Sequence, residues 1–452
     1  MAEENHIYKK MFGLPRVINL GDPYSSFIGG GVMPREVVEA MDAASKEMVH
    51  MHDLLRKSGE MIAKICHAEA GLVTSGASSA LTLASAACMT GKDLEKMRQL
   101  PDSTGLKNEI IVQHGHATHY LACVRASGAK IVEVGCSYLP VGVRTIEEFE
   151  KKPAREYYPI IEVGGGERKK YYRIFAVLPD HIENAINEKT AAIYYLTDDL
   201  SVRSTEKAHS VTVSLEEVLR IGKKHGVPVI VDAAYLLPPV SNLWRFIEMG
   251  ADLVVFSGGK AILGPNDTGI LVGRKDLVEA AALQNNPHYR FIIGRGFKVS
   301  KEQIVGLVVA LQKFAKMNEA DVIAEDVAKL KYFVEQLKDT PGIKLEIIEP
   351  LTMPVSEAIK RYPDEFDKNG VYLEPIPTFP CVRMTLDERA LGMKSAELND
   401  ALWNNDPQIH LSAAMSKFSL YHFYPRQVTQ KDWELVIKKL RDVLTKKARK
   451  KL

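Results

Sequence analysis

Two apolar runs near the middle of the chain each end in a polar residue that could hold a pyridine ring. Asp232 follows Val-Ile-Val, and Lys260 follows Leu-Val-Val-Phe-Ser-Gly-Gly. A lysine amine can form an imine with an aldehyde, and a buried carboxylate can keep a ring nitrogen protonated, so that the ring draws electrons from a substrate carbon. Burying that carboxylate is costly without a cationic partner, which a pyridinium nitrogen supplies. The pair predicts pyridoxal phosphate as the cofactor.

A cluster of small residues forms a candidate phosphate site. It stands between a short apolar run and an Ala- and Leu-rich helix expected to begin near Leu81. A helix N-terminus exposes free N–H groups, and the helix dipole favours an anion there. Such clusters are often simple helix caps, but beside the cofactor pair this one predicts a phosphate cup. Its residues are Ser75, Gly76, Ala77 and Ser78.

A histidine-rich stretch follows the strand-like run 109–112. Its members His116 and His119 should emerge at the end of that strand. One imidazole could lie flat on the cofactor ring, and a second could carry a proton. Metal binding is the competing interpretation, because the two histidines are three positions apart. We predict no metal site, since no carboxylate or cysteine stands nearby at ligand spacing.

The elements that must position these residues alternate between strand and helix. Apolar runs at 191–196, 227–233 and 253–257 have the length of buried strands, and residues 215–225 between the first two have a helical pattern. This alternation predicts βαβ units and an α/β fold with a mostly parallel sheet. Ser214 begins the intervening helix with a capping-box spacing to a glutamate.

The pattern changes along the chain and divides it into three parts. Residues 1–40 are expected to form an N-terminal arm and substrate loop, and residues 41–300 a large cofactor-binding domain. Residues 301–452 begin with a long amphipathic helix and continue as a smaller α+β domain. A predicted β-hairpin insertion at 151–175 interrupts the large domain, either as a surface insertion or as a flap near the active site.

Bulk composition narrows the class of partner. The 452 residues carry a net charge of +2, so no global field attracts nucleic acid or anionic lipid. The five cysteines form no Cys-x-x-Cys pair, which argues against a zinc site and against a secreted disulfide framework. With neither a signal peptide nor an apolar run of about 20 residues, the sequence predicts a cytoplasmic protein that acts on a small molecule.

Two motif blocks carry a family resemblance. Residues 231–239 (Val-Asp-Ala-Ala-Tyr-Leu-Leu-Pro-Pro) and 257–265 (Ser-Gly-Gly-Lys-Ala-Ile-Leu-Gly-Pro) resemble the ring-nitrogen and Schiff-base motifs of fold-type I pyridoxal phosphate enzymes. Within that family the chain is similar to the group that includes bacterial seryl-tRNA selenium transferase and D-glucosaminate-6-phosphate ammonia lyase. The similarity covers roughly the first 315 residues, and it implies a seven-stranded sheet of the aspartate aminotransferase type.

The resemblance implies roles for individual residues. Lys260 would be the Schiff-base lysine, Asp232 the partner of the pyridine nitrogen, His116 the stacking histidine and His119 a nearby polar group. The active site would be shared between subunits of a homodimer or larger homo-oligomer, with Gly264 reaching the neighbour's phosphate. The residues implied to contact the cofactor are Ser75, Gly76, Ala77, Ser78, His116, Asp232, Ala234, Ser257, Lys260 and Gly264.

The expected reaction is that of a lyase. Removal of a Cα proton followed by loss of a group from Cβ would release ammonia and a 2-oxo acid from a small amino acid or amino sugar acid. A racemase or epimerase, with Tyr24 or His119 as second proton carrier, and an aldolase use the same chemistry. Arg295 and Arg383 are candidates for binding the substrate carboxylate, and Tyr24 is a third candidate for contact with the substrate. The loop at 21–26 and residues 266–267 depart from the sugar-acid lyases, and the near-neutral charge disfavours a selenium transferase acting on tRNA.

Overall fold

The computed structural model divides the chain into two compact units. The larger unit comprises Met33–Met317 with Thr352–Ile376, and the smaller unit comprises Met1–Val32, Asn318–Leu351 and Pro377–Leu452. The residues that the structure describes are 6–21, 23–135, 161–163, 170–172, 177–197, 212–288, 292–348, 379–411 and 420–448.

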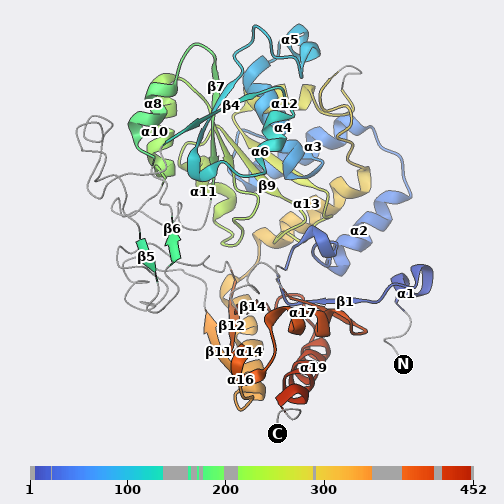
Figure 1. Ribbon diagram of the computed structural model, residues 1–452. Helices are drawn as coiled ribbons and strands as arrows, with labels where there is room; N and C mark the ends of the chain where they lie inside the picture. Colours follow the sequence, from blue (N-terminus) through green and yellow to red (C-terminus); the bar gives the residue numbers. More distant parts are fainter. Residues whose placement is uncertain are drawn as a thin grey trace. The chain divides into compact units, whose positions relative to one another are not determined.

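A seven-stranded sheet forms the centre of the larger unit (Figure 1). Its strands run parallel except for β10, which is antiparallel to both of its neighbours. The predicted α/β class with a mostly parallel sheet is therefore confirmed. In spatial order the strands are β2 (Ala70–Thr74), β10 (Gly269–Gly273), β9 (Leu253–Ser257), β8 (Val229–Asp232), β7 (Thr190–Leu196), β3 (Glu109–Gln113) and β4 (Lys130–Val134).

Helices cover both faces of this sheet. Ser214 caps the helix after β7 as predicted, since its hydroxyl accepts a hydrogen bond from the backbone N–H of Glu217. The described helices of the larger unit are α2 (Arg35–Ser45), α3 (Met51–Ile65), α4 (Gly76–Thr90), α5 (Leu94–Gln99), η2 (His114–His116), α6 (Leu121–Arg125), α8 (Pro179–Ala185), α10 (Leu215–His225), α11 (Asn242–Glu248), α12 (Lys275–Leu283) and α13 (Lys301–Ala315).

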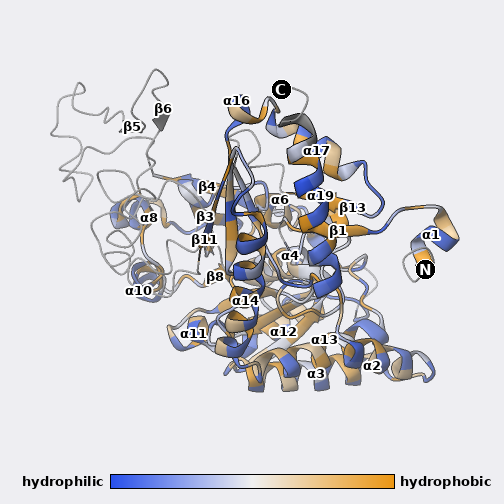
Figure 2. Ribbon diagram, turned by 90° about the horizontal axis from the view of Figure 1, so that it is seen from below, coloured by the Kyte–Doolittle hydropathy of each residue, from blue (hydrophilic) through white to orange (hydrophobic). Residues whose placement is uncertain are grey.

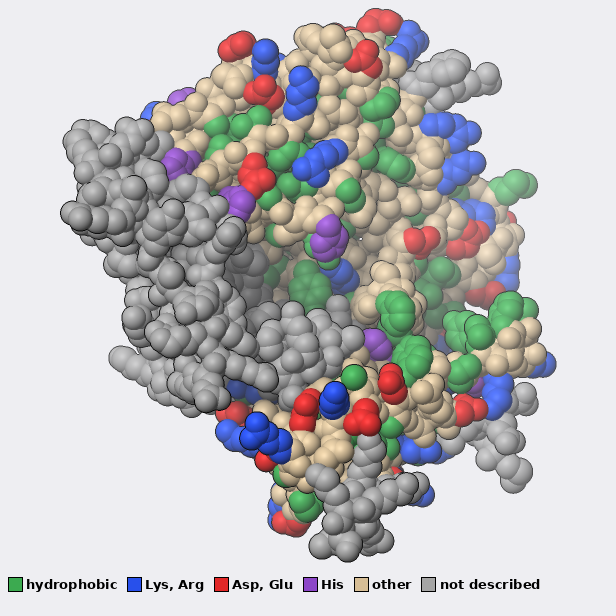
Figure 3. Space-filling model, viewed as in Figure 1, with side chains coloured by type: hydrophobic (Ala, Val, Ile, Leu, Met, Phe, Trp, Pro, Cys, Tyr) green, Lys and Arg blue, Asp and Glu red, His purple; other side chains and the backbone are tan. Residues whose placement is uncertain are grey.

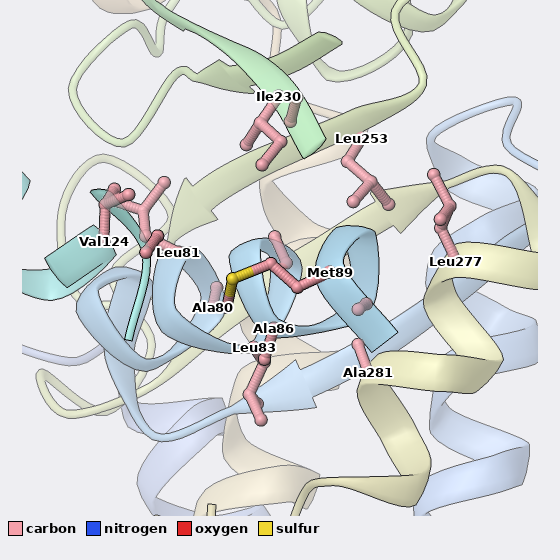
Figure 4. Close-up of a cluster of buried hydrophobic side chains, with 14 of the residues drawn as sticks. Ala80, Leu81, Leu83, Ala86, Met89, Val124, Ile230, Leu253, Leu277 and Ala281 are labelled. Carbon is pink, nitrogen blue, oxygen red and sulfur yellow. The ribbon is translucent and has the colours of Figure 1, made fainter. Parts of the chain in front are cut away.

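One face of the sheet packs against α4. Ile230 and Leu253 point from β8 and β9 toward Met89 of that helix, and Leu277 of α12 completes the cluster (Figure 4). Side chains alternate between the faces of a strand. Accordingly Val229, next to Ile230, is buried on the opposite face, where α10 packs on β7 and β8 and α3 packs on β2. Hydrophobic and hydrophilic residues alternate along α2 and α3, as in amphipathic helices (Figure 2).

The parallel strands all end at one edge of the sheet, here called the carboxyl edge. Gly269 begins β10 at this edge and pairs with both Thr74 of β2 and Ser257 of β9. A Cβ atom on Gly269 would lie 2.3 Å from the carbonyl carbon of Gly76 and 2.6 Å from the nitrogen of Ala77. Glycine at position 269 therefore lets the first turn of α4 pack directly on the strand.

The smaller unit has its own sheets and core. Strand β12 is antiparallel to both β11 and β14, and β1 pairs in parallel with β13. Helices α14 and α19 pack with them around buried Phe333 and Trp433, and Arg16 forms a two-pronged ion pair with Asp432 at 2.6 and 2.8 Å. The described elements are α1 (Ile7–Phe12), β1 (Val17–Asn19), η1 (Ser26–Ile28), α14 (Glu319–Leu337), β11 (Ile343–Ile348), β12 (Cys381–Leu386), α16 (Glu388–Leu391), α17 (Ser395–Trp403), β13 (Gln408–His410), β14 (Leu420–Phe423) and α19 (Gln430–Ala448).

Two short strands lie at the position of the predicted hairpin insertion. β5 (Ile161–Val163) pairs antiparallel with β6 (Lys170–Tyr172), while the connection between them and the rest of 151–175 lie outside the described residues. In the described part of the chain, no helix combines the length and the apolar character that crossing a membrane requires.

Replacing Gly269 with alanine should destabilise the larger unit. The new methyl group would overlap the backbone of Gly76, and backbone cannot move aside as a flexible side chain can. We expect a loss of about 1–3 kcal/mol in unfolding free energy, measured by thermal and urea denaturation. Gly296→Ala is the matched control, because a Cβ there meets no atom within 4 Å. Equal stability of the two variants would contradict the packing described here.

Candidate active site

Asp232, the last residue of β8, is buried at the carboxyl edge and is only 4% exposed. Its Oδ2 accepts a hydrogen bond from the hydroxyl of Tyr194 at 2.8 Å, and its Oδ1 accepts one from the backbone N–H of Ala234 at 3.1 Å. Its backbone carbonyl accepts hydrogen bonds from both the N–H and the hydroxyl of Thr197, at 3.0 and 2.8 Å. Tyr194 of β7 and the turn after β8 thus hold the carboxylate, and Thr197, the residue after β7, holds the backbone of Asp232.

Burial has the largest effect on the pKa values of both Asp232 and Tyr194. Removal from water raises the pKa of the Asp232 carboxyl above its ordinary value of 3.8, although the hydrogen bonds from Tyr194 and Ala234 and the charge of Lys260 act in the opposite direction. Burial, followed by the charge of Asp232, also raises the pKa of Tyr194 far above that of a free phenol. Tyr194 therefore remains protonated and donates to Asp232 at every physiological pH.

Lys260 lies in a tight loop that follows β9. The carbonyl of Gly258 accepts a hydrogen bond from the N–H of Gly264 at 2.9 Å, which closes the loop. A Cβ atom on Gly259 would lie 2.3 Å from the Cα of Asn266, so the two halves of the loop approach more closely than any larger residue permits. The glycines that flagged Lys260 in the sequence thus hold its backbone at the carboxyl edge.

The side chain of Lys260 is half-buried and has two described electrostatic neighbours. Its Nζ lies 4.8 Å from the centre of the Tyr235 ring. Its charge also acts on Asp232, at the end of the neighbouring strand. The structure therefore brings together the two residues on which the cofactor prediction depends.

The first turn of α4 begins directly after β2 at the same edge. Gly76 has a φ of +81°, and the side chain of Ser75 makes no cap hydrogen bond. The first N–H groups of any α-helix lack partners within the helix. The hydroxyls of Thr74 and Ser79 donate to the carbonyls of Gly76 and Ser75, at 2.9 and 2.5 Å, and these bonds leave the N–H groups unused. The arrangement can hold a phosphate, as the sequence predicts for residues 75–78.

His116 lies in η2, immediately after β3, and is fully buried. Its Nδ1 accepts a hydrogen bond from the backbone N–H of Leu196 at 3.3 Å, which places the proton of the neutral ring on Nε2. The edge of its ring meets the ring of Tyr195, with centres 4.5 Å apart. His116 therefore occupies a fixed position at the ends of β3 and β7.

His119 has different surroundings from His116. It is exposed, and its ring lies 4.1 Å from that of Tyr120, which is also exposed. Among the described residues, no group of three or more His, Cys, Asp or Glu side chains is arranged to hold a metal ion. The polar role suggested for His119 stays a prediction.

The remaining residues predicted to contact a cofactor lie on the same segments. Ala234 already donates its N–H to Asp232. Ser257 is the last residue of β9, and Gly264 belongs to the Lys260 loop. Their positions follow from the strand ends, and their contacts with a cofactor stay predictions.

The three candidate substrate residues lie in different surroundings. Arg295 belongs to the larger unit and is exposed. Tyr24 and Arg383 belong to the smaller unit. Tyr24 is 3% exposed, with its ring edge against Phe379, and Arg383 on β12 pairs in register with His422 of β14. Burial and the charge of Arg383 lower the pKa of His422 to about 4, so this histidine is neutral beside the arginine.

Sequence reasoning missed two tyrosines of this site. Tyr194 is an inner residue of the apolar run 191–196, where nothing distinguishes it from a core residue. Its role follows only from the pairing of β7 with β8, which sets it next to Ile230 in register and within reach of Asp232. Tyr235 lies in the motif block 231–239, where no role was predicted for it. Its position three residues after Asp232, just past the end of a buried strand, could have indicated that it lies near the same edge of the sheet.

The described residues fit pyridoxal phosphate. A buried carboxylate held by two donors suits a protonated ring nitrogen, and the turn of α4 packed on Gly269 leaves N–H groups for a phosphate. The amine of Lys260 comes from the loop after β9, and β9 lies between β2 and β8 in the strand order β2, β10, β9, β8. The N–H groups, the amine and the carboxylate are suited to the phosphate, the aldehyde and the ring nitrogen of the cofactor, respectively.

Comparison with known proteins finds similarity to the same group of enzymes. The family model of L-seryl-tRNA selenium transferase matches residues 162–362. A 5'-C-glycyluridine monooxygenase-decarboxylase from a Streptomyces species is 27% identical over 420 residues, which is 93% of this chain and 88% of the relative. D-glucosaminate-6-phosphate ammonia lyase from Salmonella typhimurium is 26% identical over 442 residues, 97% of this chain and 98% of the relative. L-seryl-tRNA(Sec) selenium transferase from Aquifex aeolicus is 26% identical over 57% of each chain.

Solved structures show the same fold. The structure of a D-glucosaminate-6-phosphate ammonia-lyase superposes with a TM-score of 0.73 at 24% identity and covers 98% of this chain and 99% of its own. A NifS-like protein superposes with a TM-score of 0.52 at 15% identity over 96% of this chain and its own full length. At these identities the likeness concerns the fold.

Replacing Tyr194 with phenylalanine should make the cofactor-free protein less stable as the pH rises. A group with a raised folded-state pKa contributes stability below its unfolded pKa, and that contribution is lost as the pH rises through the folded value. Removal of the Tyr194 donor raises the pKa of Asp232 further. In the variant, the decrease in stability with rising pH therefore continues to higher pH. At a pH above the folded-state pKa of Asp232 in both proteins, we expect the variant to lose about 1.5–3 kcal/mol of unfolding free energy, because a hydrogen bond to a charged group is removed.

The measurement is urea denaturation of the wild type and Tyr194→Phe between pH 4 and 8, repeated in an Asp232→Asn background. The loss of unfolding free energy caused by Tyr194→Phe should grow with pH when Asp232 is present. It should be nearly independent of pH in the Asp232→Asn background. Tyr421→Phe is the matched control, because this buried hydroxyl donates to a neutral carbonyl, that of Ser395. A deficit of Tyr194→Phe that is independent of pH would show that the bond to Asp232 has no electrostatic role.

Proposed function

We propose that this chain, which is similar to fold-type I pyridoxal phosphate enzymes, is a lyase that releases ammonia from a small amino acid or amino sugar acid. The observation that carries the proposal is the buried Asp232 carboxylate beside Lys260 at the carboxyl edge. The end-to-end similarity to an ammonia lyase, over 97% of this chain, supports the type of reaction.

Different residues of the larger unit would bind different parts of the cofactor. Asp232 would bind the ring nitrogen, the N–H groups of residues 75–78 the phosphate, and His116 one face of the ring. Lys260 would form the Schiff base. When bound in this way, pyridoxal phosphate acidifies the proton on the substrate carbon that bears the amine.

Lys260 is the group of this chain that would move the proton. In the proposed reaction the amine of Lys260 would accept the proton from the substrate carbon that bears the amine. Loss of a hydroxyl, thiol or phosphate from the next carbon, followed by hydrolysis, then yields a 2-oxo acid and ammonia. Tyr194 remains protonated, and the hydrogen bond that it donates would favour the ionised form of Asp232 and hold the carboxylate in place.

Substrate binding and assembly complete the proposal. Arg295 or Arg383 would bind the substrate carboxylate through the guanidinium fork, and Tyr24 would contact the substrate. A homodimer or larger assembly with shared active sites, in which Gly264 reaches the neighbour's phosphate, follows from the family resemblance. A racemase, epimerase or aldolase would need the same Lys260 and Asp232.

A second candidate is an oxidative decarboxylase. The similarity to a monooxygenase-decarboxylase covers 93% of this chain, nearly as much as the similarity to the ammonia lyase. Action on aminoacylated tRNA has less support, because the selenium transferase of Aquifex aeolicus matches only 57% of the chain. Acidic and basic side chains are also interspersed over the described part of the face in Figure 3, whereas tRNA binding favours a basic surface.

The decisive experiment begins with an absorbance spectrum of the purified protein. A band at about 420 nm is expected, characteristic of a protonated imine of the cofactor. Lys260→Ala should abolish this band, whereas Lys298→Ala, which removes an exposed lysine of the same unit, should retain it. Failure of the wild type to develop the band after addition of pyridoxal phosphate would refute the cofactor assignment.

A panel of amino acids and phosphorylated amino sugar acids then identifies the reaction. Release of ammonia and a 2-oxo acid in equal amounts, without uptake of oxygen, is the expected result for a lyase. Oxygen uptake with release of carbon dioxide would instead establish the oxidative decarboxylase. Exchange of the Cα proton with solvent deuterium and no other product would indicate a racemase or epimerase.

A further inference from the structure

The ring of Tyr235 lies against the amine of Lys260. The distance of 4.8 Å from Nζ to the ring centre is within the range of about 6 Å over which a ring face attracts a cation. The tyrosine is 43% exposed and therefore adds no large share to the apolar core. Its described contact is with the one lysine on which the proposed reaction depends.

The backbone on both sides of Tyr235 is tightly held. The N–H of Ala233 donates to the carbonyl of Val255 at 2.9 Å, which extends the pairing of β8 with β9 past Asp232. On the other side, the N–H of Leu236 donates to the carbonyl of Ala233 at 3.1 Å. The carbonyl of Leu236 accepts a hydrogen bond from the side-chain amide of Asn242 at 2.8 Å. The ring thus projects from a fixed turn toward the Lys260 loop.

We propose that Tyr235 is a positioning residue that stabilises the ammonium form of Lys260. This inference rests on the proposed function, in which Lys260 accepts the Cα proton and so becomes an ammonium. The ring face of Tyr235 then favours the product of that proton transfer and strengthens Lys260 as a base. Asp232, at the end of the neighbouring strand, acts on Lys260 in the same direction through its charge.

The first test measures the charge of Lys260 without any cofactor. Brief acetylation of the apo-protein at a series of pH values, with the Lys260 peptide quantified by mass spectrometry, reports how readily the amine loses its proton. Replacing Tyr235 with leucine or methionine should move the labelling midpoint to lower pH by about half a unit, the equivalent of a two- to fivefold change. Tyr235→Phe retains the ring and should behave as the wild type. Tyr332→Leu, an exposed tyrosine of the smaller unit, is the control.

The second test measures turnover of the holoenzyme. The two non-aromatic variants should lower kcat two- to fivefold, and Tyr235→Phe should restore it. A phenylalanine variant that behaves like the leucine variant would assign the effect to the hydroxyl and overturn the ring contact. An unchanged labelling midpoint in both non-aromatic variants would also overturn it.

These outcomes separate the inference from the proposed function. A shifted midpoint with unchanged kcat would overturn the catalytic part of the inference and leave the contact intact. Absence of the cofactor band in the wild type would overturn the proposed function, while the labelling result would still decide whether the ring acts on Lys260.

Discussion

The burial of one carboxylate governs the chemistry of the larger unit. Removing the charge of Asp232 from water costs several kcal/mol, and the fold offsets this cost with the Tyr194 hydroxyl, the Ala234 N–H and the nearby Lys260. These groups come from neighbouring strand ends, so the carboxylate is stable only when β7, β8 and β9 are in register. A cationic ring nitrogen would offset the same cost, so the proposed cofactor would stabilise the fold through this residue.

Close backbone packing at the carboxyl edge gives the site its rigidity. Gly269 lets the first turn of α4 approach the sheet, and Gly259 lets the loop of Lys260 fold against Asn266. The phosphate cup and the lysine are thereby fixed to the same pair of strands, β10 and β9. Fixed groups lose little freedom when a cofactor binds, and this preorganisation contributes to both affinity and rate.

The Asp232 and Lys260 pair is compatible with several reactions of pyridoxal phosphate, and the relatives that match this chain are named for different activities. An ammonia lyase and a monooxygenase-decarboxylase each match more than nine-tenths of this chain. Both names are compatible with a carbon activated next to an amine, which the Asp232 and Lys260 pair can provide. The ring centre of Tyr235 lies 4.8 Å from the Lys260 amine, and its proposed role is to stabilise the ammonium form of that lysine.

The sequence alone determined the residues whose position depends on local order along the chain. A strand that ends in Asp232, a strand and two glycines before Lys260, and small residues at the start of α4 all lie at the carboxyl edge because parallel strands end together. Tyr194 and the Tyr235 contact with Lys260 were decided only by tertiary structure, because each depends on which strands are neighbours and in what register. Pairing energies between distant segments set that register, and no local pattern reports them.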